Sequence, residues 1–208
     1  MEIDKLNIEI GETYHGWSDV RISIKDKEFK IQASYLGDHP ISGLINAVFN
    51  AWLYFSSMGG FDKLEESEIL FQDEPRGLKL VISHFESINE NQKFNDYTLD
   101  LKILSSEDSF RGDKDKIEWK ELLIGKILLI DLVRETIRNF KQIIKLHGFL
   151  GLRNKWHLGS AWENDYFPSM IDIEKVLALN SLLKDPEAYM AYADTAKEEA
   201  EFFREIYE

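Results

Sequence analysis

Apolar and polar residues alternate with a period of two along the first third of the chain. Residues 20–24 follow this pattern, and after a polar turn at residues 26–28 it resumes over residues 29–35. Because successive side chains of a strand point to opposite faces, the alternation predicts a β-hairpin with one buried face. Residues 6–10 carry the same pattern and predict a third strand.

The period changes to that of a helix after Pro40, a residue type that favours the first turn of a helix. Apolar residues then recur at helical spacing until the pair Gly59-Gly60, which ends the run. These apolar positions are Ile41, Leu44, Ile45, Val48, Trp52 and Leu53. We therefore expect an amphipathic helix that packs on the sheet.

Strand patterns return after this helix. Residues 69–71 and 78–85 flank the segment 73–77, whose proline and glycine favour a tight turn, so a second hairpin is predicted. Residues 97–103 alternate again and predict one more strand.

The second half of the chain has the spacing of helices. Residues 115–118 resemble a capping box, and the apolar pattern from Ile117 to Leu146 contains no proline. We expect one long central helix there, with a bend near Gly125. Residues 172–183 and 187–207 predict two further helices.

Together these elements predict a single α+β domain over residues 1–208. We expect an antiparallel sheet of about five or six strands, packed by one helix, in a sheet-rich part at residues 1–110. A helical part at residues 111–208 follows, with the long helix at its centre. The hydrophobic fraction of 44% and the aromatic fraction of 12% are typical of a folded globular chain.

Charge narrows the classes of partner. The chain has 38 acidic and 25 basic residues and a formal net charge of −13, which repels the phosphates of DNA and RNA and anionic lipid surfaces. The same charge attracts a basic protein and raises its association rate. We therefore expect a basic protein partner, and neither nucleic acid nor a membrane. The alternative is that the acidity serves solubility alone.

The absence of cysteine excludes disulfides and cysteine-ligated metal centres and favours a reducing compartment. The first residues lack the basic and apolar regions of a secretion signal. The most apolar run, residues 122–133, is interrupted by two charges and is shorter than the ~20 residues that span a bilayer. These features predict a cytoplasmic protein.

The sequence lacks the common enzyme motifs: a phosphate-binding loop, a dinucleotide-binding glycine turn, a nucleophile elbow and a zinc-binding His-Glu-x-x-His helix. The five histidines are not paired at the spacing of metal ligands on one strand or helix face. We therefore expect no metal, no cofactor and no catalytic residue. A site assembled from distant carboxylates remains an alternative.

One short motif supports an enzymatic alternative. Residues Arg153 to His157 resemble the Arg-polar-spacer-His motif of HEPN ribonucleases, in which the arginine and the histidine flank the scissile phosphate. The spacer here is shorter than in that family. The alternative function is a small hydrolase or nuclease with a site around Arg153 and His157. The competing explanation is a loop whose two side chains contact helix carbonyls or carboxylates.

The connection from Gly148 to Ser169 is rich in aromatic residues. Its tryptophans and tyrosine either form a small satellite core or anchor a partner, because such side chains beside an acidic rim are typical of binding hot spots. The candidate partner-binding residues are Trp156, Trp162, Glu163, Asp165 and Tyr166.

Residues 36–45 with the amphipathic helix, the segment 71–78 and the alternating strands resemble small bacterial immunity proteins of polymorphic-toxin and contact-dependent inhibition systems. The resemblance covers about a third of the chain and leaves out the helical second half. It implies a cytosolic, non-catalytic antitoxin that binds one cognate toxin domain and occludes its active site. The first hypothesis is therefore an acidic binding protein of this kind. A further alternative is a structural subunit of a homo-oligomer.

Overall fold

The structure is a computed structural model, and the part of the chain that it describes has several gaps. The described residues are 2–34, 39–58, 60–61, 64, 66–90, 93–109, 116–156, 168–184 and 195–208.

Seven strands, one short 3-10 helix and four α-helices lie within these residues. In chain order they are β1 (Leu6–Tyr14), β2 (Trp17–Ile24), β3 (Lys27–Ser34), α1 (Pro40–Met58), β4 (Ser67–Asp73), β5 (Arg76–Ser87), η1 (Phe94–Asp96), β6 (Tyr97–Ser106), β7 (Lys120–Leu128), α2 (Leu129–Trp156), α3 (Met170–Lys184) and α4 (Thr195–Tyr207).

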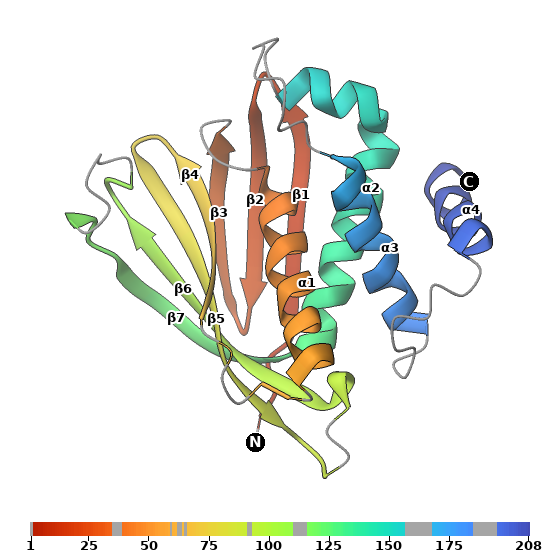
Figure 1. Ribbon diagram of the computed structural model, residues 1–208. Helices are drawn as coiled ribbons and strands as arrows, with labels where there is room; N and C mark the ends of the chain where they lie inside the picture. Colours follow the sequence, from red (N-terminus) through yellow and green to blue (C-terminus); the bar gives the residue numbers. More distant parts are fainter. Residues whose placement is uncertain are drawn as a thin grey trace.

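The predicted α+β class is confirmed, but the layout of the strands differs from the prediction. Among the described residues the strands form two antiparallel sheets: sheet A in the order β1-β2-β3, and sheet B in the order β4-β5-β6-β7. The expectation of one sheet with about five or six strands is therefore wrong. Figure 1 shows sheet A beside sheet B, with β3 next to β4 and α1 lying across both sheets.

The predicted helix from Ile117 to Leu146 is also wrong in its first part. Residues Lys120–Leu128 form β7, which pairs with β6, and the helix begins only at Leu129. Gly125 lies in this strand opposite Leu101, and the bend expected there lies instead at Gly148, whose φ of 63° is left-handed. A mostly apolar run suits a buried strand as well as a helix, so periodicity alone did not separate the two.

The inner faces of the two sheets and one face of α1 and α2 share one hydrophobic core. On β1 and β2 the inward apolar residues are buried, and α1 buries eight of its residues, including Leu44 and Ile45. A Cβ on Gly43 would lie 2.8 Å from Ile69 Cγ2, so this glycine lets α1 approach β4 closely. The alternation read in the sequence is thus the inward and outward alternation of the sheets.

Side chains of α2 cover the outer edge of sheet A. Glu135 accepts a hydrogen bond from Ile8 N at 2.8 Å, and Asn139 accepts one from Ile10 N at 2.8 Å. Asn139 also donates to Ile8 O at 2.7 Å, and His147 accepts from Thr13 N at 3.1 Å. An open strand edge is a template for pairing with another chain. Here the helix replaces the missing neighbour of β1.

The outer edge of sheet B is covered by residues that belong to, or precede, sheet A. Asp4 N donates to Lys126 O at 2.7 Å, and Lys126 N donates to Asp4 Oδ2 at 2.9 Å. The ammonium groups of Lys25 and Lys27 lie 3.2 and 3.5 Å from the carbonyl oxygens of Ile124 and Leu122. The tip of the β2–β3 hairpin therefore lies along the edge of β7.

Helix α3 packs against α1 and α2, and α4 packs against α2 and α3 (Figure 1). The helix predicted at residues 172–183 is confirmed as α3. The final helix is confirmed from Thr195, and the earlier part of its predicted range, up to residue 194, lies outside the described residues.

Candidate functional site

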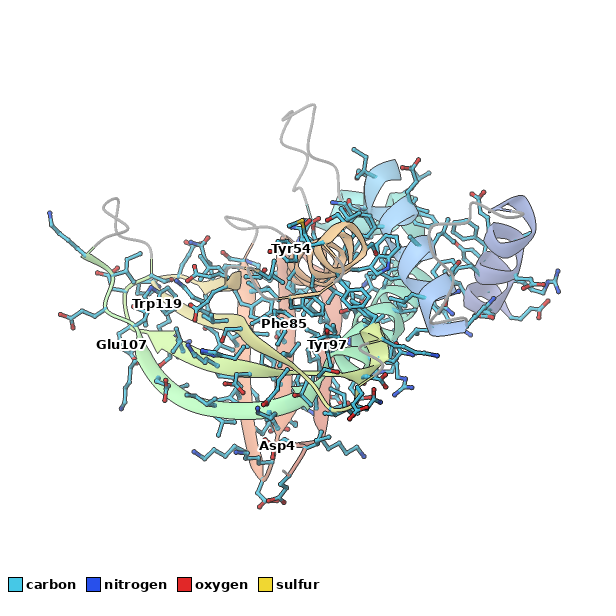
Figure 2. The ribbon with its side chains drawn as sticks, turned by 60° about the horizontal axis from the view of Figure 1, so that its bottom comes forward. Asp4, Tyr54, Phe85, Tyr97, Glu107 and Trp119 are labelled. Atoms are coloured by element: carbon cyan, nitrogen blue, oxygen red, sulfur yellow. The ribbon has the colours of Figure 1, made fainter. Side chains whose placement is uncertain are left out.

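An open groove at one end of sheet B gathers a tryptophan with acidic and basic side chains, and we call it the Trp119 groove. It lies where β6 ends and β7 begins, and its volume is about 480 Å³. Its lining residues are Ser105, Ser106, Glu107, Asp108, Lys116, Glu118, Trp119 and Lys120. Figure 2 shows Trp119 and Glu107 at this end of the molecule, far from α2, α3 and α4.

Trp119 packs against the β4–β5 hairpin. A Cβ on Gly77 would lie 3.3 Å from the indole Cη2 and 2.5 Å from Ser109 Cβ, so only glycine leaves room for both neighbours. The Lys79 ammonium lies 4.5 Å from the centre of a ring of the Trp119 indole and 2.9 Å from Glu68 Oε2. A cation over an indole face is attracted by the negative charge density of the ring. Packing and charge together fix the position of Trp119.

Ser109 holds the start of the β6–β7 connection against the same hairpin. Its N–H donates to Pro75 O at 2.7 Å, and its hydroxyl lies 3.1 Å from Pro75 O and 2.7 Å from Arg76 O. The serine is only 4% exposed. These contacts anchor the connection beside the groove to the β4–β5 hairpin.

The lining of the groove suits binding to a protein surface. Trp119 is half-buried, so part of the indole stays accessible, and Glu107 and Glu118 are exposed. Three carboxylates against two ammonium groups give the lining a small negative excess. A fixed tryptophan inside a polar rim is the usual composition of an interface hot spot.

The partner-binding residues predicted from the sequence lie elsewhere. Trp156 is the last residue of α2, and its side chain lies outside the description. The other four predicted residues, Trp162, Glu163, Asp165 and Tyr166, lie outside the described residues altogether. Their role remains a prediction.

The enzymatic alternative rests on residues in the same region. Arg153 belongs to α2, but its side chain is not described, and His157 lies outside the described residues. The alternative site around Arg153 and His157 stays a prediction.

Trp119 is absent from the predicted set because residues 117–146 read as one helix. In a helix, a tryptophan near the first turn is one more packing residue. The local signal was the sequence Glu118-Trp119-Lys120, in which charges flank a tryptophan just before an apolar run. That signal indicates a groove lining only once residues 120–128 are known to form an edge strand.

A second polar cluster lies on β5, which bulges at His84. His84 has a left-handed φ of 51°, and its Nδ1 lies 3.3 Å from Ser83 Oγ and 3.5 Å from Asp100 Oδ2. Both contacts use the same ring nitrogen, whereas a catalytic serine–histidine–carboxylate triad needs one nitrogen for each partner. The bulge has a packing consequence, because it turns Phe85 inward to stack on Phe61 at 4.2 Å.

The charged groups beside His84 form an ion pair across sheet B. Lys126 donates to Glu86 at 2.7 Å and lies 3.9 Å from Asp100. The hydrogen bond from Lys126 holds the pKa of Glu86 below its usual value, and Glu86 raises the pKa of Lys126. A carboxyl tuned as a general acid has the opposite shift, so this pair has the character of a surface ion pair.

Within the described residues, no three histidine or carboxylate side chains are grouped as ligands for a metal ion. No helix in the same part of the chain is long and apolar enough to cross a bilayer.

Comparison with known proteins adds no identification. No protein-family model matches the chain, and no curated protein or solved structure matches it either.

Proposed function

We propose that this protein is a non-catalytic binding protein for a basic protein partner, and that the Trp119 groove is part of its binding surface. The observation that carries the proposal is the half-buried Trp119, which packs beside Gly77 and Lys79 and lies next to exposed carboxylates in an open groove. The formal net charge of −13 supports a basic partner, because opposite charge accelerates encounter and fixes orientation.

In its most specific form, the proposal makes the protein an immunity protein. The partner is then a toxin domain whose active site is occluded by the complex, and no turnover is required. Support for this form comes from the sequence resemblance and from the acidic composition. The residues predicted from the sequence, Trp156, Trp162, Glu163, Asp165 and Tyr166, stay a separate candidate for partner binding.

Affinity capture from the native cell, read by quantitative mass spectrometry, tests the proposal. Wild-type protein is compared with Trp119→Ala and with Trp17→Ala, which removes another half-buried tryptophan on sheet A. We expect one basic protein to be retained by wild type and Trp17→Ala, and to be depleted at least about 10-fold with Trp119→Ala, as for the loss of a hot spot.

Because Trp119 packs on Gly77, a second pair of variants separates binding from folding. Glu118→Lys reverses an exposed charge at the groove, and Glu174→Lys makes the same reversal on α3. We expect Glu118→Lys, but not Glu174→Lys, to weaken capture of the partner. Because salt screens surface charges, the difference between Glu118→Lys and wild type should become smaller at high salt. Equal capture by all variants, or no specific partner for wild type, would refute the assignment of the groove.

A further inference from the structure

Two histidines that are distant in the sequence meet at one residue of β1. His39 precedes α1, and its Nε2 lies 3.1 Å from Thr13 Oγ1. His147 lies on α2, and its Nε2 accepts a hydrogen bond from Thr13 N at 3.1 Å. Thr13 is fully buried, and His39 is 1% exposed. We call this contact between the three segments the Thr13 junction.

Each imidazole accepts a hydrogen bond from a backbone amide. His147 accepts from Thr13 N, and His39 Nδ1 accepts from Ile41 N at 3.3 Å. Because Nδ1 of His39 is an acceptor, its proton lies on Nε2, which donates to Thr13 Oγ1. A protonated imidazole has two N–H donors and no acceptor, so both amide contacts require the neutral ring.

We propose that the Thr13 junction is a pH-sensitive latch that holds the start of α1 and the end of α2 against β1, and that opens when the two histidines are protonated. Protonation removes the acceptors of two buried amides. It also places positive charge at the N-terminus of α1, where the helix dipole disfavours a cation. The first turn of α1 contains no acidic residue to offset that charge.

Titratable side chains near the junction in the sequence or on the paired strands are Glu12, His15, Asp19 and Lys145. All four are exposed, so water screens their effect on a buried ring. Farther along α2, Glu135 and Arg138 are paired with each other at 2.6 Å and hold Ile8.

The position of His147 determines which part of α2 the latch holds. His147 comes directly before Gly148, where α2 bends, so this ring attaches the end of the straight part of α2 to the edge of β1. Leu146 and Leu150 on either side of this ring are 57% and 73% exposed, whereas Phe149 packs on Phe140 and Phe203. Loss of the contact therefore loosens the polar attachment of α2 to β1 and leaves the apolar contacts of Phe149 in place.

Amide hydrogen exchange of the wild-type chain, measured by NMR at pH values from about 8 to about 5, tests the proposal. The amides of Thr13 and Ile41 are compared with the amide of Ile10, which is bonded to the non-titrating Asn139 on the same strand edge. We expect protection at Thr13 and Ile41 to fall about 10-fold relative to Ile10, the loss that corresponds to one hydrogen bond. Equal behaviour of the three amides would overturn the proposal.

Two variants test whether the imidazoles of His39 and His147 cause the pH dependence of amide protection. In His39→Asn and His147→Gln, an amide oxygen replaces the acceptor nitrogen without a proton-binding group. We expect each variant to lose the pH dependence at the amide that its own side chain accepts from. Wild-type-like pH dependence in both variants would show that other groups cause it and would also reject the latch.

Discussion

Asn139 shows at the scale of one residue how the exposed edge of a sheet is closed. It is fully buried in α2, yet its amide accepts from Ile10 N and donates to Ile8 O, the hydrogen bonds that a neighbouring strand would otherwise supply. The same amide also donates to Glu135 O, one turn earlier in the helix. A buried polar group with all these partners stabilises the contact between helix and sheet.

Replacement of this amide by a side chain of similar size is a direct test. Asn139→Leu leaves the buried Ile10 N–H without an acceptor, so we expect a loss of about 2–3 kcal/mol in the free energy of unfolding. Urea denaturation measures it. The control Gln142→Leu changes an exposed residue of the same helix and should stay within about 0.5 kcal/mol of wild type. A loss for Asn139→Leu no larger than for the control contradicts the role of the amide.

The sequence gives no sign of this role. Glu135, Arg138 and Asn139 have the appearance of an ordinary solvated helix face, because helical spacing shows that they share a side and not what lies opposite. His39 and His147 are likewise isolated in the sequence. Their partner is the backbone of β1, which carries no side-chain signal.

At the scale of elements, α4 depends on a few buried side chains. Phe202 is fully buried, and Ile206 is 1% exposed. The ring of Phe202 lies 6.3 Å from that of Phe140 on α2. Lys141 pairs with Glu205 and lies over the Phe202 ring at 4.8 Å. Apolar contact and one ion pair therefore join α4 to α2.

Truncation of the buried anchor should release this helix. We expect Phe202→Ala to cost about 3–4 kcal/mol of local stability, seen as a loss of hydrogen-exchange protection in α4. The half-buried Phe203 is the matched control, and Phe203→Ala should cost clearly less. Equal effects at both positions would mean that α4 is not held by the buried ring.

The ion pair adds a pH dependence of known sign. The hydrogen bond from Lys141 lowers the pKa of Glu205 below its usual value of 4.5. The stability that this ion pair contributes is therefore present above pH 4.5 and is lost as the pH falls through the lowered pKa. Acid should therefore loosen α4 through Glu205 only at a pH well below the range in which histidines titrate.

The boundary between β7 and α2 is also decided at this scale. Residues 122–130 are nearly all apolar, and a strand and a helix both bury such a run. The pairing of β7 with β6 selects the strand, because the edge of β6 would otherwise be open. This partner lies outside any local window of sequence.

At the scale of the whole molecule, Gly125 on β7 marks one place where the sheets meet, another being the contact between β3 and β4. A Cβ at this position would lie 2.2 Å from Ile24 Cδ1, so the side chain of sheet A occupies the space that a residue of sheet B would need. Ile24 is fully buried there. Asp4, Lys25 and Lys27 hold the same corner along the edge of β7.

A methyl group at Gly125 should therefore separate the sheets. We expect Gly125→Ala to cost about 1–3 kcal/mol through overpacking, measured by thermal or urea unfolding. Gly151→Ala is the control, because its Cβ would meet only His147 Cβ at 3.8 Å and alanine favours a helix. A stability unchanged at Gly125 would show that the corner adapts without strain.

The sequence by itself determined the α+β class, the strands and the helix of the first 103 residues, and the presence of helices at the end of the chain. These features follow from the period of apolar residues, because each strand or helix must bury one face whatever its neighbour is. The charge of −13 likewise belongs to the composition.

Only the tertiary structure decided the division into two sheets, the strand at β7, the Trp119 groove and the Thr13 junction. Each depends on which backbone lies opposite a given face or edge. Gly77 fits beneath Trp119 and Gly125 fits beneath Ile24 because of residues far away in the chain. Periodicity records that a face is buried, and long-range packing determines what covers it.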